Sequence, residues 1–448
     1  MDEILQRFLE EAPVAVMVRA TIVRTIASST LDEIFDRHAS AQYTRELTFS
    51  TLAQLMSKVV FCMYPSVNAA YQRTRDIPVS VTSVYNKLNG LETPVSQALV
   101  AETACSMGEI LSALPESPAH QPVKGLRLRT LDGNALAGTD HRIACLRGSG
   151  AAALPGMSLV VRDGRTGLLT DIVPCEDAYT NERTLYADIL PLVKPNDLWL
   201  ADRNFCTDDY LGGIEDRNAF FLIRHHAGTK LHPLGPETHR RSRSGRTVSE
   251  QRVRAGCLTC RCIIIRLKKP LRDGTTEIRL LTNVPRERLS AWKAAELYRT
   301  RWLIESAFQE LTVNLQCEIN TLGYPKAALF GFALAVVAYN VLVVTRAALA
   351  VGLGEEISGT DTLSSYQMAV EVASVDKGLS IAVPASVWQK FVTMTVSEFA
   401  SWLYEVAREI DWRTYRKRPR GPKKPVAVKR TRRGAHRSTA RELIKHQK

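Results

Sequence analysis

Three acidic residues, far apart in the sequence, carry the side chains best suited to chemistry. Asp132 follows the alternating run LRLRTL, Asp202 follows the apolar run LWLA, and Glu305 lies in a stretch of helical character. Carboxylates at strand ends project from a sheet edge, where they can converge on an ion. Two Mg²⁺ ions about 3.5–4 Å apart can activate water and stabilise a leaving oxygen during phosphodiester cleavage. The acids therefore predict a two-ion site for Mg²⁺ or Mn²⁺.

Each acid taken singly also has an ordinary explanation. The DG dipeptide at Asp132 is typical of a turn. Asp202 can cap a helix or pair with Arg203, and Glu305 can be one of many acids on a helix surface. The prediction of a metal site therefore depends on the combination of the three.

The residues before Glu305 add a second pattern. Tyr298, Arg301 and Glu305 are spaced by three and four positions, which predicts one shared helix face. Arginine suits phosphate because its planar group donates two parallel hydrogen bonds. We expect Glu305 to hold metal and Tyr298 and Arg301 to bind DNA phosphate nearby. The alternative is an ordinary surface pair between Arg301 and Glu305.

These motifs resemble those of a known family of enzymes. The spacing Tyr-x2-Arg-x3-Glu in YRTRWLIE resembles the signature of insertion-sequence transposases of the insertion-sequence-four family. The DG dipeptide at Asp132 resembles that family's first-aspartate motif, and DRNF, beginning at Asp202, resembles its second. The resemblance covers residues 126–345. It implies an Asp-Asp-Glu (DDE) transposase with an RNase H-like core and a β insertion between the second Asp and the Glu.

The resemblance also implies a reaction and its partners. Such an enzyme hydrolyses a phosphodiester at the ends of its element, and the exposed 3′ hydroxyl then attacks target DNA. The implied partners are double-stranded DNA, as terminal repeats and as target, and a second copy of the chain bound to DNA. Movement would be by cut and paste, with a hairpin intermediate as one option, in the bacterial cytoplasm at the nucleoid.

One position departs from the family pattern. A lysine is usual seven residues after the Glu, but Thr312 stands there, and no Lys or Arg lies between Arg301 and Lys326. Two alternatives therefore stay open. One is a catalytically weakened, transposase-derived DNA-binding protein, and the other is a simple metal-dependent nuclease that cuts DNA without joining it.

The fold class we expect is α/β, with helical regions on both sides of a mixed-sheet core. Residues 1–120 are expected to form a helical DNA-binding domain. Residues 121–350 would form the catalytic domain, with a β-rich insertion at 226–282. Residues 351–410 would be helical and suited to dimerisation, and 411–448 a basic tail without fixed structure.

The charge of the chain is concentrated at one end. The net charge is +13, and residues 411–448 contain fifteen Lys and Arg against two acids, so the remainder is formally neutral. Such a tail is typical of pairing with polyanions. Arg203, beside Asp202, and the basic run with Arg240, Arg241 and Arg243 are further candidates for contact with the DNA backbone.

Two other features have competing interpretations. Residues 327–344 are eighteen uncharged residues, long enough for a membrane span, but Asn340 and several alanines favour a buried helix and no membrane partner. Nine scattered cysteines and the acidic N-terminus indicate a reducing compartment and no secretory signal. The CLTCRC segment has only one CxxC, so we expect packing rather than zinc. Trp292 and Trp302 are expected in the core.

Overall fold

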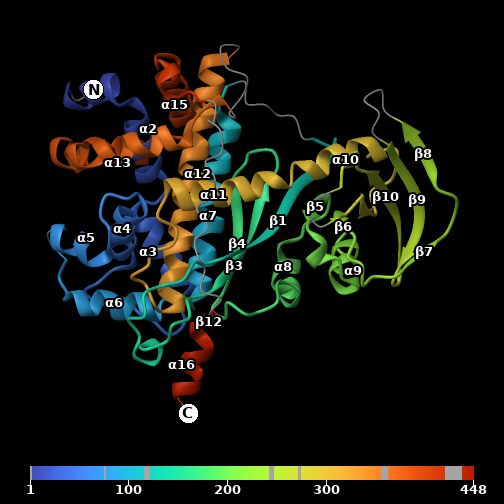
Figure 1. Ribbon diagram of the computed structural model, residues 1–448. Helices are drawn as coiled ribbons and strands as arrows, with labels where there is room; N and C mark the ends of the chain where they lie inside the picture. The colour runs from blue at the N-terminus through green and yellow to red at the C-terminus, as the bar shows by residue number, and fades with distance from the viewer. Residues whose placement is uncertain are drawn as a thin grey trace.

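The computed structural model describes residues 3–74, 77–115, 122–241, 247–270, 274–354, 362–418 and 436–447. A helical half lies on one side, and a large mixed sheet extends from it (Figure 1). The strands of this sheet are β1 (Arg127–Ala135), β3 (Met157–Asp163), β4 (Leu169–Cys175), β5 (Asp197–Ala201), β6 (Phe220–Arg224), β7 (Leu231–Pro233), β8 (Thr238–Arg241), β9 (Thr247–Ala255), β10 (Leu258–Arg266) and β11 (Glu277–Thr282).

Strands β1, β3, β4, β5 and β6 form the mixed-sheet core that the sequence predicts. Their order in the sheet is β4-β3-β1-β5-β6. Strand β3 is antiparallel to β1 and β4 is antiparallel to β3, whereas β5 and β6 run parallel to β1. This order and these directions are those of an RNase H-like core, which confirms the predicted fold class. All five residues of β5 are buried, as expected for a parallel strand covered on both faces.

The β-rich insertion is present, but it is not a separate sheet. Strand β11 pairs with β6, and the sheet continues through β10 and β9 to β7, with β8 also paired to β9. The insertion thus covers the edge that β6 would otherwise expose, a common way to protect an unpaired strand. Cys260 and Cys262 lie on β10 and are buried, and burial raises the pKa of their thiols to about 12 and about 11. They therefore pack as neutral core side chains.

The helices lie in three groups. In the N-terminal region they are α1 (Glu3–Glu11), α2 (Pro13–Thr25), α3 (Ser28–His38), α4 (Phe49–Val60), α5 (Val67–Arg73), α6 (Val81–Gly90) and α7 (Thr93–Ala113). Beside the sheet they are α8 (Tyr186–Ile189), α9 (Asp208–Glu215), α10 (Ala291–Arg299) and α11 (Trp302–Asn314). The C-terminal ones are α12 (Pro325–Leu353), α13 (Ser365–Ala382), α14 (Ala385–Thr393), α15 (Val396–Arg408) and α16 (Thr439–Gln447).

Helix starts follow the capping residues in the sequence. The hydroxyls of Thr48, Ser80 and Ser290 each accept a hydrogen bond from the first turn of α4, α6 and α10. Such caps satisfy backbone N–H groups that have no partner inside the helix. The sequence therefore fixes where these three helices begin.

Helix α12 is the centre of the helical half. One hydrophobic cluster contains residues of α1 to α7, of α12 and of α13 to α15, so the N-terminal helices and the 351–410 region share a core. Among the described residues, α12 is the one unbroken helix long and apolar enough to cross a membrane, and its apolar window is entirely buried. The bent pair α2 and α3 passes the same test only when taken together. The prediction of a buried helix at 327–344 is confirmed.

Asn340 shows how a polar side chain is accommodated in this helix. Its amide nitrogen donates to the carbonyl of Leu169 at 2.8 Å, and its amide oxygen accepts from the Leu169 N–H at 2.9 Å. Leu169 begins β4, the outer strand of the core. Asn340 thus satisfies the backbone of an edge strand that α12 covers.

The end of the chain is more ordered than expected. Residues 437–438 form β12 (Arg437–Ser438), which pairs in parallel with β2 (Ala153–Leu154), and α16 follows. Asp177 accepts hydrogen bonds from Ser438 at 2.6 Å and Arg441 at 2.7 Å. The expectation of a tail without fixed structure is therefore wrong for residues 436–447, which bind a strand and a carboxylate. It is also wrong for residues 411–418, where Trp412–Tyr415 form a 3-10 helix and the Lys417 N–H donates to the Thr362 carbonyl. Residues 419–435 lie outside the described part of the chain.

Candidate active site

The register of β1 and β5 brings two of the predicted acids together. In this parallel pair, Arg127 lies opposite Asp197 and Thr130 opposite Leu200, a constant offset. The pairing ends there, and the same offset continued by two residues would put Asp132 beside Asp202, the residue that follows β5. Neighbouring strands lie about 4.8 Å apart. Asp132 was expected just after its strand, but β1 continues to Ala135 and pairs Asp132 with Val160.

Both aspartates also belong to the same face of the sheet. Side chains alternate along a strand. Leu128 on β1 and Leu198 and Leu200 on β5 pack in the cluster that includes α10. Asp132 and Asp202 each follow one of these leucines by an even number of residues. They therefore belong to the face that α10 and α11 cover. Figure 1 shows α11 and α10 running end to end across the sheet.

The signature residues lie where α10 ends and α11 begins. The backbone N–H of Arg301 donates to Tyr298 and that of Ile304 to Arg301, both bonds spanning three residues rather than four. Such tighter turns interrupt an α-helix and often mark functional positions. The expectation of one continuous helix is thus corrected, although Thr300 and Arg301 keep helical backbone angles.

Arg301 connects two of the three acids. Its Nη1 donates to Oδ2 of Asp132 at 2.8 Å, and its Nη2 donates to Oε1 of Glu305 at 2.7 Å. The Arg301 side chain is 9% exposed, that of Asp132 is 18% exposed and that of Glu305 is 37% exposed. One buried guanidinium therefore balances a strand carboxylate and a helix carboxylate, which is more than a surface ion pair between neighbours on a helix.

The electrostatic surroundings of Asp132 are unusual. Burial raises the pKa of its carboxyl to about 6, although Arg301 and the Gly133 N–H lower it, and the nearby charges of Glu305 and Glu182 raise it further. Burial disfavours the charged form, and like charges add to this effect. Asp132 therefore lies in a pocket of negative charge that one arginine only partly offsets.

Glu182 is a fourth acid at this site, which the sequence did not indicate. A Cβ added at Gly133 would lie 2.1 Å from Glu182 Oε1, so glycine leaves the space that this carboxylate occupies. The other carboxylate oxygen accepts a hydrogen bond from Asn204 at 3.3 Å. Glu182 thus connects the motif of Asp132 with that of Asp202. Its position one residue into a short helical turn, after the cap Asn181, gave no signal of this role.

Arg224 is a further residue that the sequence analysis missed. It ends β6, and the pairing of Ala201 with Ile223 puts it next to the level of Asp202. Its charge lowers the pKa of Tyr298. The only signal in the sequence was its place directly after the apolar run AFFLI.

The structure gives Tyr298 a different contact from the one predicted. Its side chain is buried, and its hydroxyl donates to the carbonyl of Ala201 at 3.3 Å, next to Asp202. Burial raises the pKa of Tyr298, so the phenol stays neutral. Instead of facing DNA, Tyr298 fastens the end of α10 to the end of β5.

The other predicted DNA contacts have different surroundings. Arg203 is exposed beside Asp202. Arg240 and Arg241 end β8, where their backbones pair with Val248 and Thr247. Arg243 lies outside the described residues.

Two residues of α11 complete the comparison with the sequence. The hydroxyl of Thr312 donates to the carbonyl of Phe308 at 3.0 Å, inside its own helix. Trp302 is 61% exposed, so the expectation that it packs in the core is wrong. The Arg301 guanidinium lies 5.4 Å from the centre of the Trp302 ring. Trp292 is half-buried against the core, as expected.

The chemistry of these side chains fits a divalent cation. Carboxylate oxygens are the ligands that Mg²⁺ prefers, and Asp132 and Glu305 already share one cation, the Arg301 guanidinium. Within the described ranges, however, no three His, Cys, Asp or Glu side chains gather closely enough to enclose a metal ion. Ions would therefore have to replace the contacts that Arg301 makes.

Comparison with known proteins identifies the class of this domain. Residues 149–341 match the family model described as the transposase DDE domain. The match includes Asp202 and Glu305 and begins after β1, which carries Asp132. No curated protein matches the chain. Among solved structures, a piggyBac transposase synaptic complex with hairpin DNA is similar over 85% of this chain and 84% of its own, with 9% identity and a TM-score of 0.36, which is too low to support further comparison.

The RNase H-like strand order and the match over residues 149–341 agree on one kind of domain, the transposase DDE domain. Residues 149–341 resemble the transposase DDE domain, a domain of enzymes that act on DNA. Enzymes of this family cleave and join DNA and generally use divalent metal ions.

Proposed function

We propose that the chain cleaves DNA at the ends of a transposable element and transfers the resulting 3′ hydroxyl into target DNA. The observation that carries the proposal is that Arg301 joins Asp132 on β1 to Glu305 on α11, while Asp202 directly follows β5, the strand paired with β1. The pairing of β1 with β5 ends at Thr130 and Leu200, and its offset continued by two residues would put Asp132 beside Asp202. Glu305 reaches the same place from α11 through Arg301, which also binds Asp132.

In this proposal the three acids hold a pair of Mg²⁺ or Mn²⁺ ions. Bound there, the ions supply Lewis-acid activation of a nucleophilic oxygen and stabilise the leaving oxygen. Arg301, which lies between Asp132 and Glu305, would be placed to donate two hydrogen bonds to a DNA phosphate. Tyr298 keeps α10 against β5, and so keeps Arg301 and Glu305 over the aspartates.

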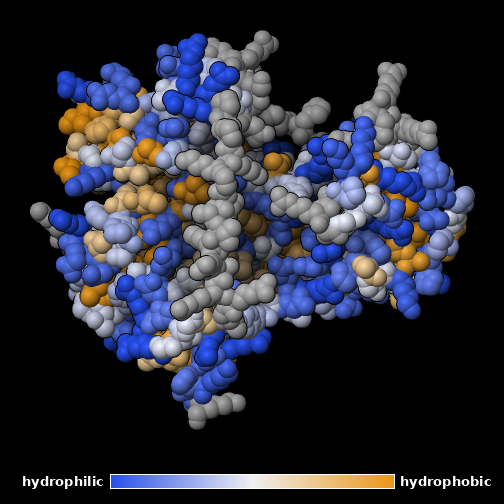
Figure 2. All heavy atoms as spheres, viewed as in Figure 1, coloured by the Kyte–Doolittle hydropathy of each residue, from blue (hydrophilic) through white to orange (hydrophobic). Residues whose placement is uncertain are grey.

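The wider setting is also part of the proposal. The substrate would be double-stranded DNA, as terminal repeats and as target, in the bacterial cytoplasm at the nucleoid. A homodimer would assemble on the DNA. Exposed apolar side chains on α13, namely Tyr366, Val370 and Ile381, support a protein contact on the helical half, where apolar atoms gather at the left of Figure 2.

The direct test is end cleavage by the wild type beside Asp132→Ala, Asp202→Ala and Glu305→Ala, with Mg²⁺ and then Mn²⁺. We expect each variant to lose cleavage by on the order of a thousandfold, because preorganised charge dominates phosphoryl transfer. Asp188→Ala, which removes an exposed acid from α8, is the matched control and should cleave normally. Normal cleavage by any of the three variants would contradict the assignment of that residue.

A strand-transfer assay separates this proposal from its rivals. A simple nuclease would cut the ends but never join them to target DNA. A weakened, transposase-derived binding protein would do neither, and Thr312 favours it, because threonine brings no charge to a position where the family usually has lysine. Joined products from the wild type would exclude both rivals.

A further inference from the structure

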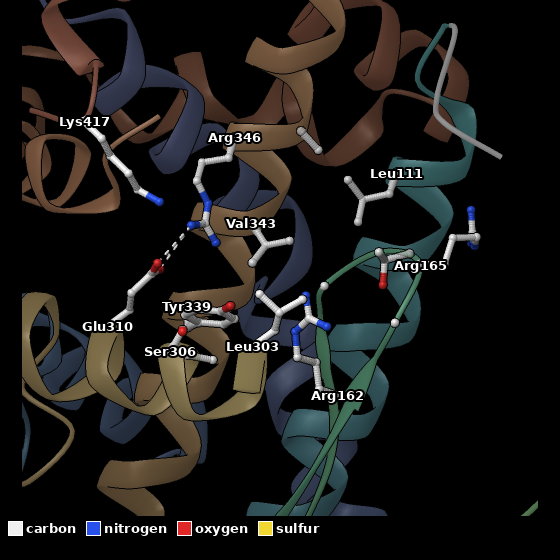
Figure 3. Close-up of a pocket in the computed structure, with 15 residues that line it drawn as sticks. Leu111, Arg162, Arg165, Leu303, Ser306, Glu310, Tyr339, Val343, Arg346 and Lys417 are labelled. Atoms are coloured by element: carbon white, nitrogen blue, oxygen red, sulfur yellow. Dashed lines mark hydrogen bonds and ion pairs between the residues drawn. The ribbon is translucent and has the colours of Figure 1, made fainter. Parts of the chain in front are cut away.

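A second polar cavity lies on another face of the helix that carries Glu305. Its volume is about 540 Å³. From α11, Leu303, Ser306, Ala307 and Glu310 line it, at the spacing of one helix face that excludes Glu305. The other walls come from α7, from the turn between β3 and β4, from α12, and from Lys417 near the start of the tail (Figure 3). The cavity is therefore distinct from the site of the three acids.

The walls of this cavity carry an excess of positive charge. Four cationic side chains line it, Arg162, Arg165, Arg346 and Lys417, against one acid, Glu310. Glu310 is already bound, because Arg346 Nη1 lies 3.2 Å from each of its carboxylate oxygens. Among the described side chains that line the cavity, three positive charges thus remain without a matching acid.

Two of these arginines have buried donors without partners. The Nε atoms of Arg162 and Arg346 are buried and make no hydrogen bond within the described chain. The Arg346 side chain is only 11% exposed. A buried donor left unsatisfied is destabilising, and more so when it is charged. Figure 3 shows the guanidinium groups of Arg162 and Arg346 and the ammonium group of Lys417 turned toward the space between their elements.

We propose that this cavity binds a phosphate group of a DNA strand. Arginine is suited to this ligand because its fork matches phosphate oxygens and donates charge-assisted hydrogen bonds. Beside the cations, Leu111, Leu303 and Val343 offer apolar surface for a sugar or a base. A pocket of this size takes a ligand as large as one nucleotide. The inference rests on the proposed action on DNA.

A polynucleotide fits the surroundings better than a free nucleotide does. The sequence that follows Lys417 contains eight Lys and Arg and no acid from residue 418 to residue 433. Positive charge therefore continues along the chain from the cavity. A strand has phosphates for both the cavity and this segment, whereas a single nucleotide has phosphates for the cavity alone.

The experiment measures DNA binding without divalent metal, so no chemistry takes place. A labelled single-stranded oligonucleotide is titrated with wild type and with the double variant Arg162→Gln/Lys417→Gln over a range of salt concentrations. We expect the double variant to bind at least about tenfold more weakly. The slope of log affinity against log salt should fall by about 1.4, because two phosphate contacts are lost.

The control removes the same charge elsewhere. Arg7 on α1 and Lys377 on α13 are exposed and do not line the cavity, so Arg7→Gln/Lys377→Gln should keep the affinity and the slope of the wild type. Equal melting temperatures for both double variants would exclude misfolding as the cause. An unchanged salt slope in Arg162→Gln/Lys417→Gln would overturn the proposal.

Two further measurements show whether the phosphate comes from DNA or from a free nucleotide, and whether the proposed reaction fails independently of this site. If ATP competes with the oligonucleotide at micromolar concentration and loses this ability in the double variant, the cavity serves a free nucleotide and the DNA assignment is wrong. If the wild type fails to cleave DNA ends while the salt slope still depends on Arg162 and Lys417, the proposed reaction fails and the phosphate site stands.

Discussion

At the scale of single residues, charge balance around Asp132 governs how the site can work. Arg301 is the only cation that contacts both Asp132 and Glu305 among the described side chains. Glu182 adds negative charge from the other side, over Gly133. A divalent ion therefore enters a site with more negative charge than one arginine can balance, which favours cation binding.

This balance predicts how metal binding depends on pH. A proton competes with metal for a carboxylate. The pKa of Asp132 is raised to about 6, so the carboxyl is protonated below this pH and ionised above it. We therefore expect Mn²⁺ affinity, measured by electron paramagnetic resonance, to hold above about pH 6 and to fall about tenfold per pH unit below it.

Two variants test whether Asp132 causes the pH dependence of Mn²⁺ affinity. Asp132→Asn should bind Mn²⁺ weakly at every pH and should not show the fall in affinity below about pH 6, because no carboxyl remains there to titrate. Asp188→Asn on α8 should retain the profile of the wild type. An affinity that stays level between about pH 5 and pH 7 in the wild type would show that Asp132 does not control metal binding.

At the scale of elements, helix α12 and strand β4 depend on each other. The helix is buried, and its one side-chain amide binds both backbone groups of Leu169. Buried backbone groups need such partners. Asn340 therefore joins the helical half to the outer strand of the core.

Asn340→Leu should consequently destabilise the protein. The substitution leaves the N–H and the carbonyl of Leu169 without partners, and each unsatisfied group costs about 1–3 kcal/mol. We expect the free energy of unfolding in urea to fall by about 3 kcal/mol. Thr345→Val is the control, because the Thr345 hydroxyl binds only the carbonyl of Val341 in its own helix. Equal effects of the two substitutions would argue against this role.

At the scale of the whole molecule, the net positive charge is concentrated in the last part of the sequence. Residues 1–410 are formally neutral, so the net charge of +13 comes from the last part of the chain. The final residues of that part pack on Asp177 through Ser438 and Arg441. The described residues before the basic segment are also held, because the Lys417 N–H donates to the Thr362 carbonyl.

Neutralising this segment should weaken binding to any DNA without changing the chemistry. With the eight Lys and Arg of residues 418–433 replaced by Gln, we expect non-specific duplex affinity to fall steeply at low salt. The salt slope should fall by several units, while the cleavage rate at saturating DNA remains unchanged. A cleavage rate that falls at saturating DNA would instead give this segment a part in the reaction.

The sequence by itself determined the kind of site and the kind of core. Strand patterns before Asp132 and Asp202, the spacing that ends at Glu305, and the apolar run of α12 are local features, which follow from side-chain periodicity and polarity. The basic character of the tail could also be predicted, because the net charge of a segment is counted from its sequence alone.

Only the tertiary structure decided which side chains meet. Strand pairing put β5, which ends just before Asp202, beside β1, which carries Asp132, and helix packing brought the Arg301 guanidinium to both Asp132 and Glu305. Glu182, Arg224 and the residues that line the cationic cavity beside α11 come from distant parts of the chain. No local pattern in the sequence therefore predicts their neighbours. Pairing between strands and packing between helices are long-range interactions, and they fix these neighbours only once the chain has folded.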